Sequence, residues 1–229
     1  MLIKGFQRLT LLDFPGRTAC TVFTGGCNFR CPFCHNAGLV TGQEDDEFDE
    51  SEIFDHLERR RNVLDGVAVT GGEPLLQPDI ERFLYELKDR GYAVKLDTNG
   101  SFPDKLAGIL ELGLVDYVAM DVKNRPEKYA ETIGLPQYDL APIEQSMKLL
   151  RESGVAYEFR TTVVERFHTP DDIAALAQWI AGAPRYFLQN FVDSGHLIDE
   201  TCRGVPKAVM QEMLERARAF VPAAELRGI

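Results

Sequence analysis

The sequence lacks the features of membrane-spanning and exported chains. It contains no run of eighteen apolar residues, and it does not begin with a basic segment followed by an apolar one, as a secretory signal peptide does. It also has no internal repeat, low-complexity segment or Pro/Ser-rich linker. We therefore expect a soluble, cytoplasmic chain with no membrane partner, in which residues 1–229 form a single domain around one well-buried core.

Positive charge is scarce relative to negative charge. The 25 Lys and Arg residues face 36 Asp and Glu residues, which gives a formal net charge of −11. Such a balance disfavours any binding mode that must neutralise many phosphates, so nucleic acid is not an expected partner. The longest acidic run, residues 44–50, is predicted to be a solvated loop.

Cysteine is also scarce, and its distribution is uneven. Three of the five cysteines, Cys27, Cys31 and Cys34, fall within eight residues. An odd number of cysteines, three of them close together, favours a thiolate metal site in a reducing compartment over a disulfide framework. Of the other two, Cys20 is predicted to pack as a small apolar residue in a strand, and Cys202 is assigned no role.

Strand-like apolar runs alternate with amphipathic, helix-like segments along the chain. The apolar runs are nearly continuous, as expected for parallel strands buried on both faces. Strands are predicted at residues 18–24, 67–70, 93–97, 115–122, 156–164 and 186–192. Helices are predicted at residues 80–87, 103–112, 143–150 and 206–220, and from Thr169, where a capping threonine precedes Pro170.

This alternation predicts an α/β fold. Six βα units are fewer than the eight of a closed barrel, so the pattern alone is compatible with an open partial barrel and with a doubly wound sheet. In both architectures, functional residues gather at the carboxyl ends of the strands. Any chemistry should therefore lie directly after the runs given above.

The cysteine loop satisfies this rule, because Gly25 to Asn36 follows the first predicted strand directly. Three thiolates spaced CxxxCxxC can surround one compact iron–sulfur cluster, and no fourth cysteine lies nearby to complete its coordination. An open metal position is typical of a reactive centre. The alternative is a Cys3His zinc site that uses His35, although this residue is adjacent to Cys34 and has little chain with which to turn back toward the metal.

The cysteine motif, with the aromatic Phe33 before its last cysteine, resembles the cluster motif of the radical S-adenosylmethionine (SAM) superfamily. The wider string, from Asp13-Phe14-Pro15-Gly16 through Cys34-His35-Asn36, is similar to the amino-terminal signature of glycyl-radical-enzyme activases. Within this family it is closest to the activating proteins of anaerobic ribonucleoside-triphosphate reductases. The resemblance extends over nearly the whole chain.

This resemblance implies a partial (β/α)6 barrel with a [4Fe-4S] cluster on Cys27, Cys31 and Cys34, and with SAM bound at the open iron. It further implies that an electron from a donor such as flavodoxin or ferredoxin cleaves SAM, and that the resulting 5′-deoxyadenosyl radical generates a glycyl radical on a partner enzyme. The bond chemistry resides in the cofactors, and no side chain is predicted to act as acid or base. Phe33, Cys34 and His35 are expected to lie against the cofactors.

Two further loops carry motifs that also occur in ordinary turns. Gly71-Gly72-Glu73 could be a turn before a helix, but it resembles the family's GGEP motif, which implies that Gly72 and Glu73 contact the SAM amino group. Paired glycines would let the backbone approach a ligand closely. Asp97-Thr98-Asn99 could likewise be a simple turn. Together with Asp121, this stretch resembles the matching segments of activases. In those proteins the carboxylates help to hold a monovalent cation.

Two cations on apolar strands have both functional and structural interpretations. Lys123 would be costly there unless an anion pairs with it. The resemblance implies contact with SAM, and the structural alternative is an ion pair with Asp121 or Asp97. Activases carry an arginine at the position of Arg160, and this resemblance implies that Arg160 contacts the SAM carboxylate. The structural alternative is an ion pair with Glu158 or Asp121.

One departure from the family pattern affects the choice of partner. Pyruvate formate-lyase activase has a histidine just past its sixth strand that touches SAM, whereas this chain has Gln189 in that stretch and its nearest histidine is His196. We therefore place Gln189 near the nucleoside and expect pyruvate formate-lyase to be a poorer partner than an anaerobic ribonucleotide reductase. Alternative functions are a radical SAM enzyme acting on a small molecule, such as a pterin in deazapurine synthesis, and a zinc-stabilised binding module.

Overall fold

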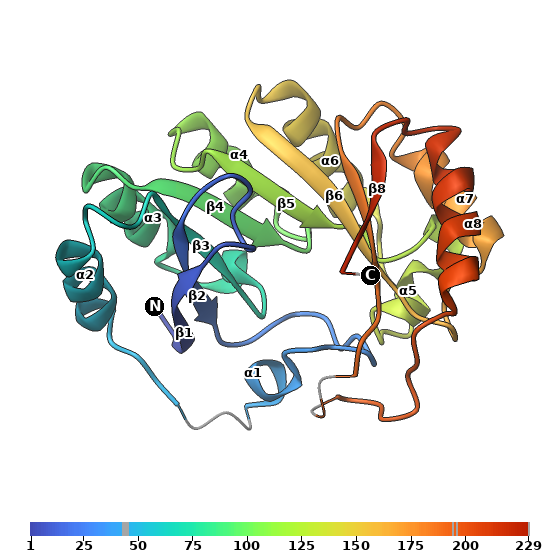
Figure 1. The fold of residues 1–229 in the computed structure, drawn as a ribbon, viewed down its shortest axis with the longest axis horizontal. Coiled ribbons are helices and arrows are strands. Elements are labelled where there is room, and N and C mark those ends of the chain that lie inside the picture. Colours follow the sequence, from blue (N-terminus) through green and yellow to red (C-terminus); the bar gives the residue numbers. More distant parts are fainter. Residues whose placement is uncertain (43–45, 194, 196, 229) are drawn as a thin grey trace.

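The structure is a computed structural model that describes residues 1–42, 46–193, 195 and 197–228. Within these residues, eight strands form one curved sheet in the sequential order β1 to β8 (Figure 1). β1 is antiparallel to β2, and every later pair is parallel. The strands are β1 (Ile3–Thr10), β2 (Ala19–Thr24), β3 (Gly66–Gly71), β4 (Ala93–Thr98), β5 (Tyr117–Asp121), β6 (Ala156–Val163), β7 (Tyr186–Asn190) and β8 (Ala224–Arg227).

The strand order decides between the two architectures that the sequence left open. A doubly wound sheet reverses direction at a switch point, whereas this order runs without reversal, as in a barrel. In the described chain β1 and β8 are the two edges, so the sheet stays open. The predicted partial barrel is therefore confirmed, and the six strands predicted from the sequence, β2 to β7, begin and end within two residues of the predicted bounds.

The two edge strands were not predicted. β1 carries Lys4, Gln7 and Arg8 among its apolar residues, and its exposed positions break the apolar run that marks a buried strand. β8 is only four residues long and ends in Arg227. Sequence patterns detect strands buried on both faces more readily than edge strands, which are partly solvated.

Figure 1 shows most of the helices on the outer side of the curved sheet and α1 (Ala37–Thr41) on its open side. Those predicted from the sequence are confirmed with small shifts at their ends; for example, α7 begins at Pro170 with Thr169 accepting a hydrogen bond from the Asp172 amide. No helix in the described ranges is long and apolar enough to cross a membrane. The helices are α1 (Ala37–Thr41), α2 (Glu50–Arg59), α3 (Ile80–Asp89), α4 (Pro103–Glu111), α5 (Tyr129–Thr132), α6 (Ala141–Glu152), α7 (Pro170–Trp179) and α8 (Lys207–Arg218), with 3-10 turns η1 (Pro74–Leu76) and η2 (Pro126–Lys128).

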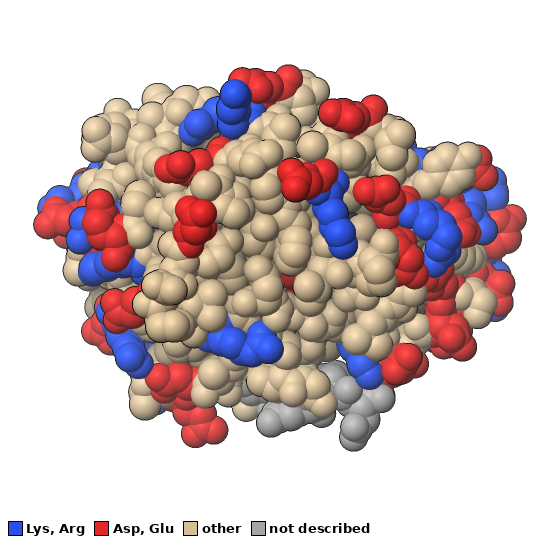
Figure 2. Space-filling model, turned by 180° about the vertical axis from the view of Figure 1, so that it is seen from behind, with Lys and Arg blue, Asp and Glu red and all other residues tan. Residues whose placement is uncertain are grey.

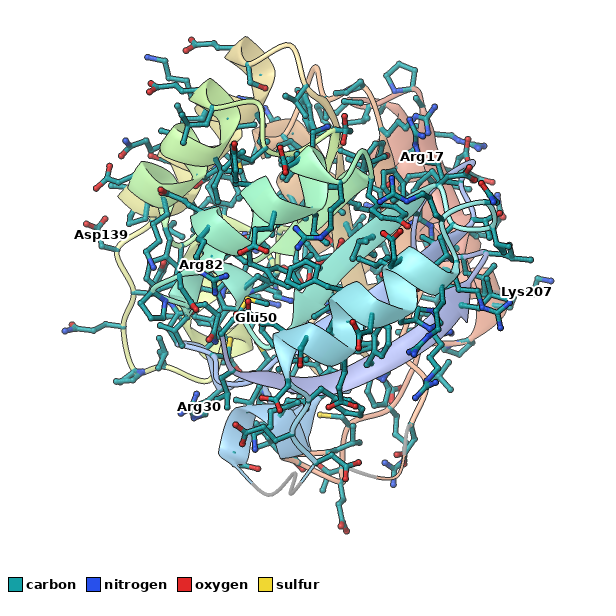
Figure 3. The ribbon with its side chains drawn as sticks, turned by 90° about the vertical axis from the view of Figure 1, so that its left-hand side faces the viewer. Arg17, Arg30, Glu50, Arg82, Asp139 and Lys207 are labelled. Carbon is teal, nitrogen blue, oxygen red and sulfur yellow. The ribbon has the colours of Figure 1, made fainter. Side chains whose placement is uncertain are left out.

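The acidic run at residues 44–50 is not simply a solvated loop, which corrects the sequence interpretation. Its last residue, Glu50, begins α2, where a carboxylate suits the positive end of the helix dipole. Glu50 also accepts a hydrogen bond from Arg82 on α3 at 2.7 Å, and the two side chains meet in Figure 3. Residues 44 and 45 lie outside the described part of the chain.

The two faces of the sheet differ in polarity because successive side chains on a strand point to opposite sides. The outer face is apolar and packs beneath the helices, with Val69, Leu96 and Met120 fully buried. The inner face carries charged residues, among them Lys95 on β4 and Arg160 on β6. On the outside of the molecule seen in Figure 2, acidic and basic side chains are interspersed around a largely uncharged centre. The concentrated polar chemistry thus lies inside the curve of the sheet.

Candidate functional site

A cavity of about 420 Å3 lies at the carboxyl ends of the parallel strands. Its volume falls within the range of small-molecule and cofactor sites. The cavity brings together every predicted site residue except Glu73, from segments that lie up to 162 positions apart in the sequence. These lining residues are Cys27, Cys31, Phe33, Cys34, His35, Gly71, Gly72, Asp97, Thr98, Asn99, Asp121, Lys123, Arg160 and Gln189.

Backbone contacts fold the cysteine loop onto the cavity. The Phe29 amide donates to the Cys27 Sγ at 3.4 Å, and the Cys34 amide donates to the Cys31 carbonyl at 3.0 Å. Arg30, which lies at the exposed edge in Figure 3, donates through its guanidinium to the Cys27 and Phe29 carbonyls at 2.6 and 2.8 Å. The loop is therefore held in a shape that turns all three thiols toward one space.

The donor set of this loop fits an iron–sulfur cluster with one open iron. Three thiols line the cavity, whereas Cys20 and Cys202 are fully buried elsewhere. Burial raises the pKa of the Cys31 thiol to about 12, although the nearby Lys123 ammonium acts in the opposite direction. Metal coordination deprotonates such a thiol outright.

The geometry gives no support to the Cys3His zinc alternative. In the described part of the chain, no group of three His, Cys, Asp or Glu side chains has the spacing to hold a single metal ion. The His35 ring packs instead against Phe191, with 5.2 Å between the ring centroids. Burial, together with Lys123, lowers the pKa of His35.

The paired glycines pack against the cysteine loop. A Cβ on Gly72 would lie 1.9 Å from the Gly26 carbonyl oxygen, and one on Gly71, where φ is +112°, would lie 2.3 Å from the Thr24 amide nitrogen. The Asn36 side chain also donates to the Gly71 carbonyl at 2.9 Å. The sequence interpretation assigned the glycines to close approach of a ligand. The structure adds a second requirement, close approach of the segment that precedes Cys27.

Glu73 is the one predicted site residue that does not line the cavity. Its carboxylate is fully buried and accepts hydrogen bonds from the Leu75 amide at 3.0 Å, the Thr98 hydroxyl at 2.8 Å and the Asn99 amide at 2.7 Å. Burial raises the pKa of Glu73 to about 7 against the effect of these donors. The carboxylate therefore faces the next loop and is not among the residues that line the cavity, and its contact with the SAM amino group stays a prediction.

Charged residues on β4, β5 and β6 form a continuous ion network, which we call the cavity network. Arg160 donates to Asp121 at 2.9 Å and to Asp97 at 3.1 Å. Lys123 donates to Asp121 at 2.9 Å, and Lys95 pairs with Asp97. The network thus has three cations and two carboxylates.

The pKa values in this network are set by competition between burial and charge. Burial alone would raise the pKa of Asp121, but Arg160 and Lys123 outweigh it and hold that pKa below its usual range. Burial alone would lower the pKa of Lys123, but Asp121 raises it above its usual value. Asp121 and Lys123 are therefore charged at neutral pH. Counted by formal charge, the three basic and two acidic side chains of the network leave one positive charge in excess.

The network also bears on three sequence interpretations. Lys123 forms an ion pair with Asp121, which is one of the two structural partners predicted from the sequence. Arg160 pairs with Asp121 and not with Glu158, which pairs with Arg227 at 2.7 Å. Both carboxylates proposed for a monovalent cation are already neutralised by Arg160 and the lysines, so the arrangement gives no support to a cation between them.

Sequence reasoning missed several residues that line the cavity. Thr70 and Thr162 lie at the carboxyl ends of predicted strands, so the strand-end rule could have found them. Asp13, which accepts a hydrogen bond from the Thr21 hydroxyl at 2.6 Å, comes from the connection between β1 and β2 and had no such signal. Other missed lining residues are Phe29, Asn36 and Val40. His196 lies outside the described residues.

Comparison with known proteins gives consistent matches. The model of the radical SAM superfamily matches residues 21–180. The chain is 31% identical over 236 residues to a glycyl-radical enzyme activating enzyme of Methanocaldococcus jannaschii, covering 100% of this chain and 96% of that one. It is 28% identical over 196 residues to the pyruvate formate-lyase-activating enzyme of Listeria monocytogenes, covering 80% and 77%.

A solved structure shows the same fold. Streptococcus suis SuiB bound to its precursor peptide SuiA aligns with a TM-score of 0.73 at 14% identity, over 91% of this chain and 48% of that one. At this identity the likeness concerns the fold alone.

Proposed function

The chain belongs to the radical SAM superfamily, and we propose from this premise that it is an activase that generates a glycyl radical on an anaerobic ribonucleotide reductase. The cofactors of the family are a [4Fe-4S] cluster and SAM. Relatives at modest identity over most of the chain support an enzyme of the glycyl-radical-enzyme activating type. The observation that carries the proposal is the single cavity that joins three cysteines to a network with surplus positive charge.

In this proposal Cys27, Cys31 and Cys34 hold the cluster and leave one iron open for SAM. When bound, the two cofactors together supply one-electron cleavage of SAM and a radical able to abstract hydrogen. The chain holds the cluster with thiolates and limits access of water through the apolar lining residues Phe29 and Phe33. No side chain is assigned as acid or base.

The cavity network is suited to the amino-acid portion of SAM. Its excess positive charge favours a carboxylate near Lys123 or Arg160, since charge-assisted hydrogen bonds in a buried site are strong. The backbone of Gly71 and Gly72 lies on the cysteine side of the same cavity. Gln189, on β7, is assigned to the nucleoside.

The choice of partner rests on sequence features and relatives. The string from Asp13 to Asn36 resembles activases of anaerobic ribonucleotide reductases, and a relative from Methanocaldococcus jannaschii that is named as a glycyl-radical enzyme activating enzyme matches over the full chain. The glutamine at position 189 makes pyruvate formate-lyase a poorer candidate. An electron donor such as flavodoxin or ferredoxin would supply the reducing electron.

The test mixes anaerobically reconstituted protein with SAM, a reductant and an anaerobic ribonucleotide reductase, and records the electron paramagnetic resonance (EPR) spectrum. The expected result is about four irons per chain, as one cluster requires, and a stable doublet on the partner. The doublet should vanish when the partner's radical-site glycine is changed to Ala, or when Cys31→Ala activase is used.

Two outcomes would overturn the proposal. Stoichiometric zinc without iron after anoxic purification would remove the enzyme assignment and favour a binding module. SAM cleavage that consumes a small molecule, with no radical on several glycyl radical enzymes, would move the protein to the small-molecule class.

A further inference from the structure

The Asn99 side chain connects the turn after β4 to the cysteine loop. Its Nδ2 lies 3.8 Å from the Cys27 Sγ and 2.9 Å from the Asn28 Oδ1. Within the described residues, it is the one side-chain nitrogen that donates a hydrogen bond to a sulfur of the three cysteines. The turn motif that carries Asn99 therefore makes a contact to the cysteine loop that the sequence did not indicate.

Surrounding hydrogen bonds fix which end of the Asn99 amide faces the sulfur. Its Oδ1 accepts from the Ser101 backbone amide at 2.9 Å and from the Ser101 hydroxyl at 2.5 Å. Asn28 in turn donates through its own Nδ2 to the Ser101 Oγ at 2.9 Å. The three side chains thus form a closed ring of donors and acceptors, and a flipped Asn99 amide would place two donors against Ser101 and an oxygen against Cys27.

The backbone of Asn99 is held as firmly as its side chain. Its amide donates to the fully buried Glu73 carboxylate at 2.7 Å, and Glu73 also accepts from the Thr98 hydroxyl beside it. Since Glu73 faces this turn and not the cavity, its carboxylate supports the residue whose amide reaches Cys27. A buried carboxyl group that accepts from three donors is a rigid anchor.

We propose that Asn99 is a positioning residue that raises the reduction potential of the cluster by donating an N–H···S hydrogen bond to the Cys27 thiolate; the inference rests on the proposed function. Adding an electron makes the cluster more negative, so a donor aimed at a ligand sulfur stabilises the reduced state more than the oxidised state. Hydrogen bonds to the sulfurs are among the factors that set such potentials. The second donor to Cys27 is the Phe29 backbone amide, which leaves Asn99 as the donor that side-chain substitution can remove.

The experiment is a redox titration of the anaerobically reconstituted protein, followed by the EPR signal of the reduced cluster. It is performed without SAM, because Asn99 also lines the cavity. Asn99→Ala should retain the iron content of the wild type and show a more negative midpoint potential. The matched control is Asn190→Ala, which removes an amide that, within the described residues, is hydrogen-bonded to the Val205 backbone alone, and its midpoint should be unchanged.

A second variant predicts a shift of opposite sign. Asn28→Ala removes the oxygen that accepts from the Asn99 amino group and lies 4.0 Å from the Cys27 Sγ. The Asn99 amino group can then move closer to the sulfur, so the midpoint should become less negative. If Asn99→Ala fails to hold iron, Asn28→Ala decides the question, and an unchanged or more negative midpoint there overturns the inference.

The inference and the proposed function fail in different ways. Full iron content in Asn99→Ala with the midpoint of the wild type would overturn the role of Asn99 and leave the activase proposal intact. A wild-type protein that binds no [4Fe-4S] cluster would overturn the activase proposal itself, before any variant is compared.

Discussion

Two ion clusters lie on the inner face of the sheet, and they differ in access and in charge. The cavity network lies at the carboxyl ends of the strands and has one cation in excess. Nearer the amino ends, Glu158 on β6 accepts two hydrogen bonds from Arg227 on β8, at 2.7 and 3.1 Å, and a third from the Tyr117 hydroxyl at 2.6 Å. We call these three residues the basal cluster. Its one cation balances its one carboxylate.

The surroundings of the two clusters differ in the same way. The Arg227 guanidinium lies 3.7 Å from the centroid of the Phe187 ring, and Tyr117 packs with Phe14 in a small apolar cluster at the amino ends of the strands. The basal cluster is thus closed on several sides, whereas the cavity network borders about 420 Å3 of open space. A charge-balanced ion pair away from the cavity joins strands, while a network with surplus charge beside a cavity is suited to a ligand of opposite charge.

The largest effect that this comparison predicts is on stability. Arg227→Ala should lower the free energy of unfolding by about 2 to 4 kcal/mol, because the buried Glu158 carboxyl group would keep, among the described residues, the Tyr117 hydroxyl as its one side-chain hydrogen-bond partner. The loss should remain below that of a fully enclosed pair, since Arg227 is 32% exposed. Guanidinium denaturation under anoxia measures the change.

The same variant should leave the dissociation constant for SAM unchanged once it is folded. A double variant, Arg227→Met with Glu158→Gln, provides the control, because it removes both charges and should recover part of the lost stability. If Arg227→Ala weakened SAM binding at unchanged stability, the basal cluster would belong to the binding site and the distinction between the two clusters would be wrong.

The sequence predicted the six buried strands but not the basal cluster, for a physical reason. Continuous apolar runs identify strands with two buried faces, whereas β8 is a short edge strand whose important residue is charged. Arg227 and Glu158 are 69 positions apart, and they come together because β6, β7 and β8 lie side by side in one sheet. A pairing of that kind has no local signal.

The sequence predicted where the candidate site lies more completely than it predicted the contacts of the side chains in it. The strand-end rule placed Asp97, Asp121 and Lys123 at one edge, and the cavity brings them together. For Arg160, the sequence offered two partners, and the register of β5 against β6 places Asp121 directly opposite. The hydrogen bonds of Glu73 to the next loop could not be predicted, because a motif shows that a carboxylate follows two glycines but not the direction in which its side chain turns.

The second prediction concerns the surplus cation. Lys123→Met should weaken SAM binding by about 1.5 to 3 kcal/mol, the scale of one charged hydrogen bond. Its effect on the free energy of unfolding should be smaller than that of Arg227→Ala, because Asp121 keeps its 2.9 Å hydrogen bond from Arg160. Equilibrium binding of SAM to the reconstituted protein measures the first quantity.

Lys128→Met is the matched control for this variant. Lys128 also pairs with a buried carboxylate, that of Asp172, at 2.7 Å, but it does not line the cavity. Its loss should reduce stability and leave SAM affinity and iron content unchanged. Equal SAM affinities in wild type and Lys123→Met would show that Lys123 serves the ion network alone, and that surplus charge does not identify the ligand-binding cluster.

The smallest expected effect involves a residue behind the cavity network. His168 lies in the connection between β6 and α7 and is almost fully buried. Its Nδ1 accepts from the Val164 amide at 3.1 Å, which leaves the proton on Nε2 to donate to the Lys123 carbonyl at 2.8 Å. Burial lowers the pKa of His168 and so favours this neutral form.

Because the Lys123 backbone depends on this bond, His168→Ala should weaken SAM binding by about 0.5 to 1 kcal/mol, the net value of one neutral hydrogen bond, in addition to lowering stability. His168→Gln can present a donor at a similar reach and should recover part of the SAM affinity. Measuring SAM affinity and the free energy of unfolding on both variants separates the two roles. If His168→Ala loses stability but keeps the SAM affinity of the wild type, the position of Lys123 is fixed by its ion pair with Asp121, and the cavity network needs no support from the loop behind it.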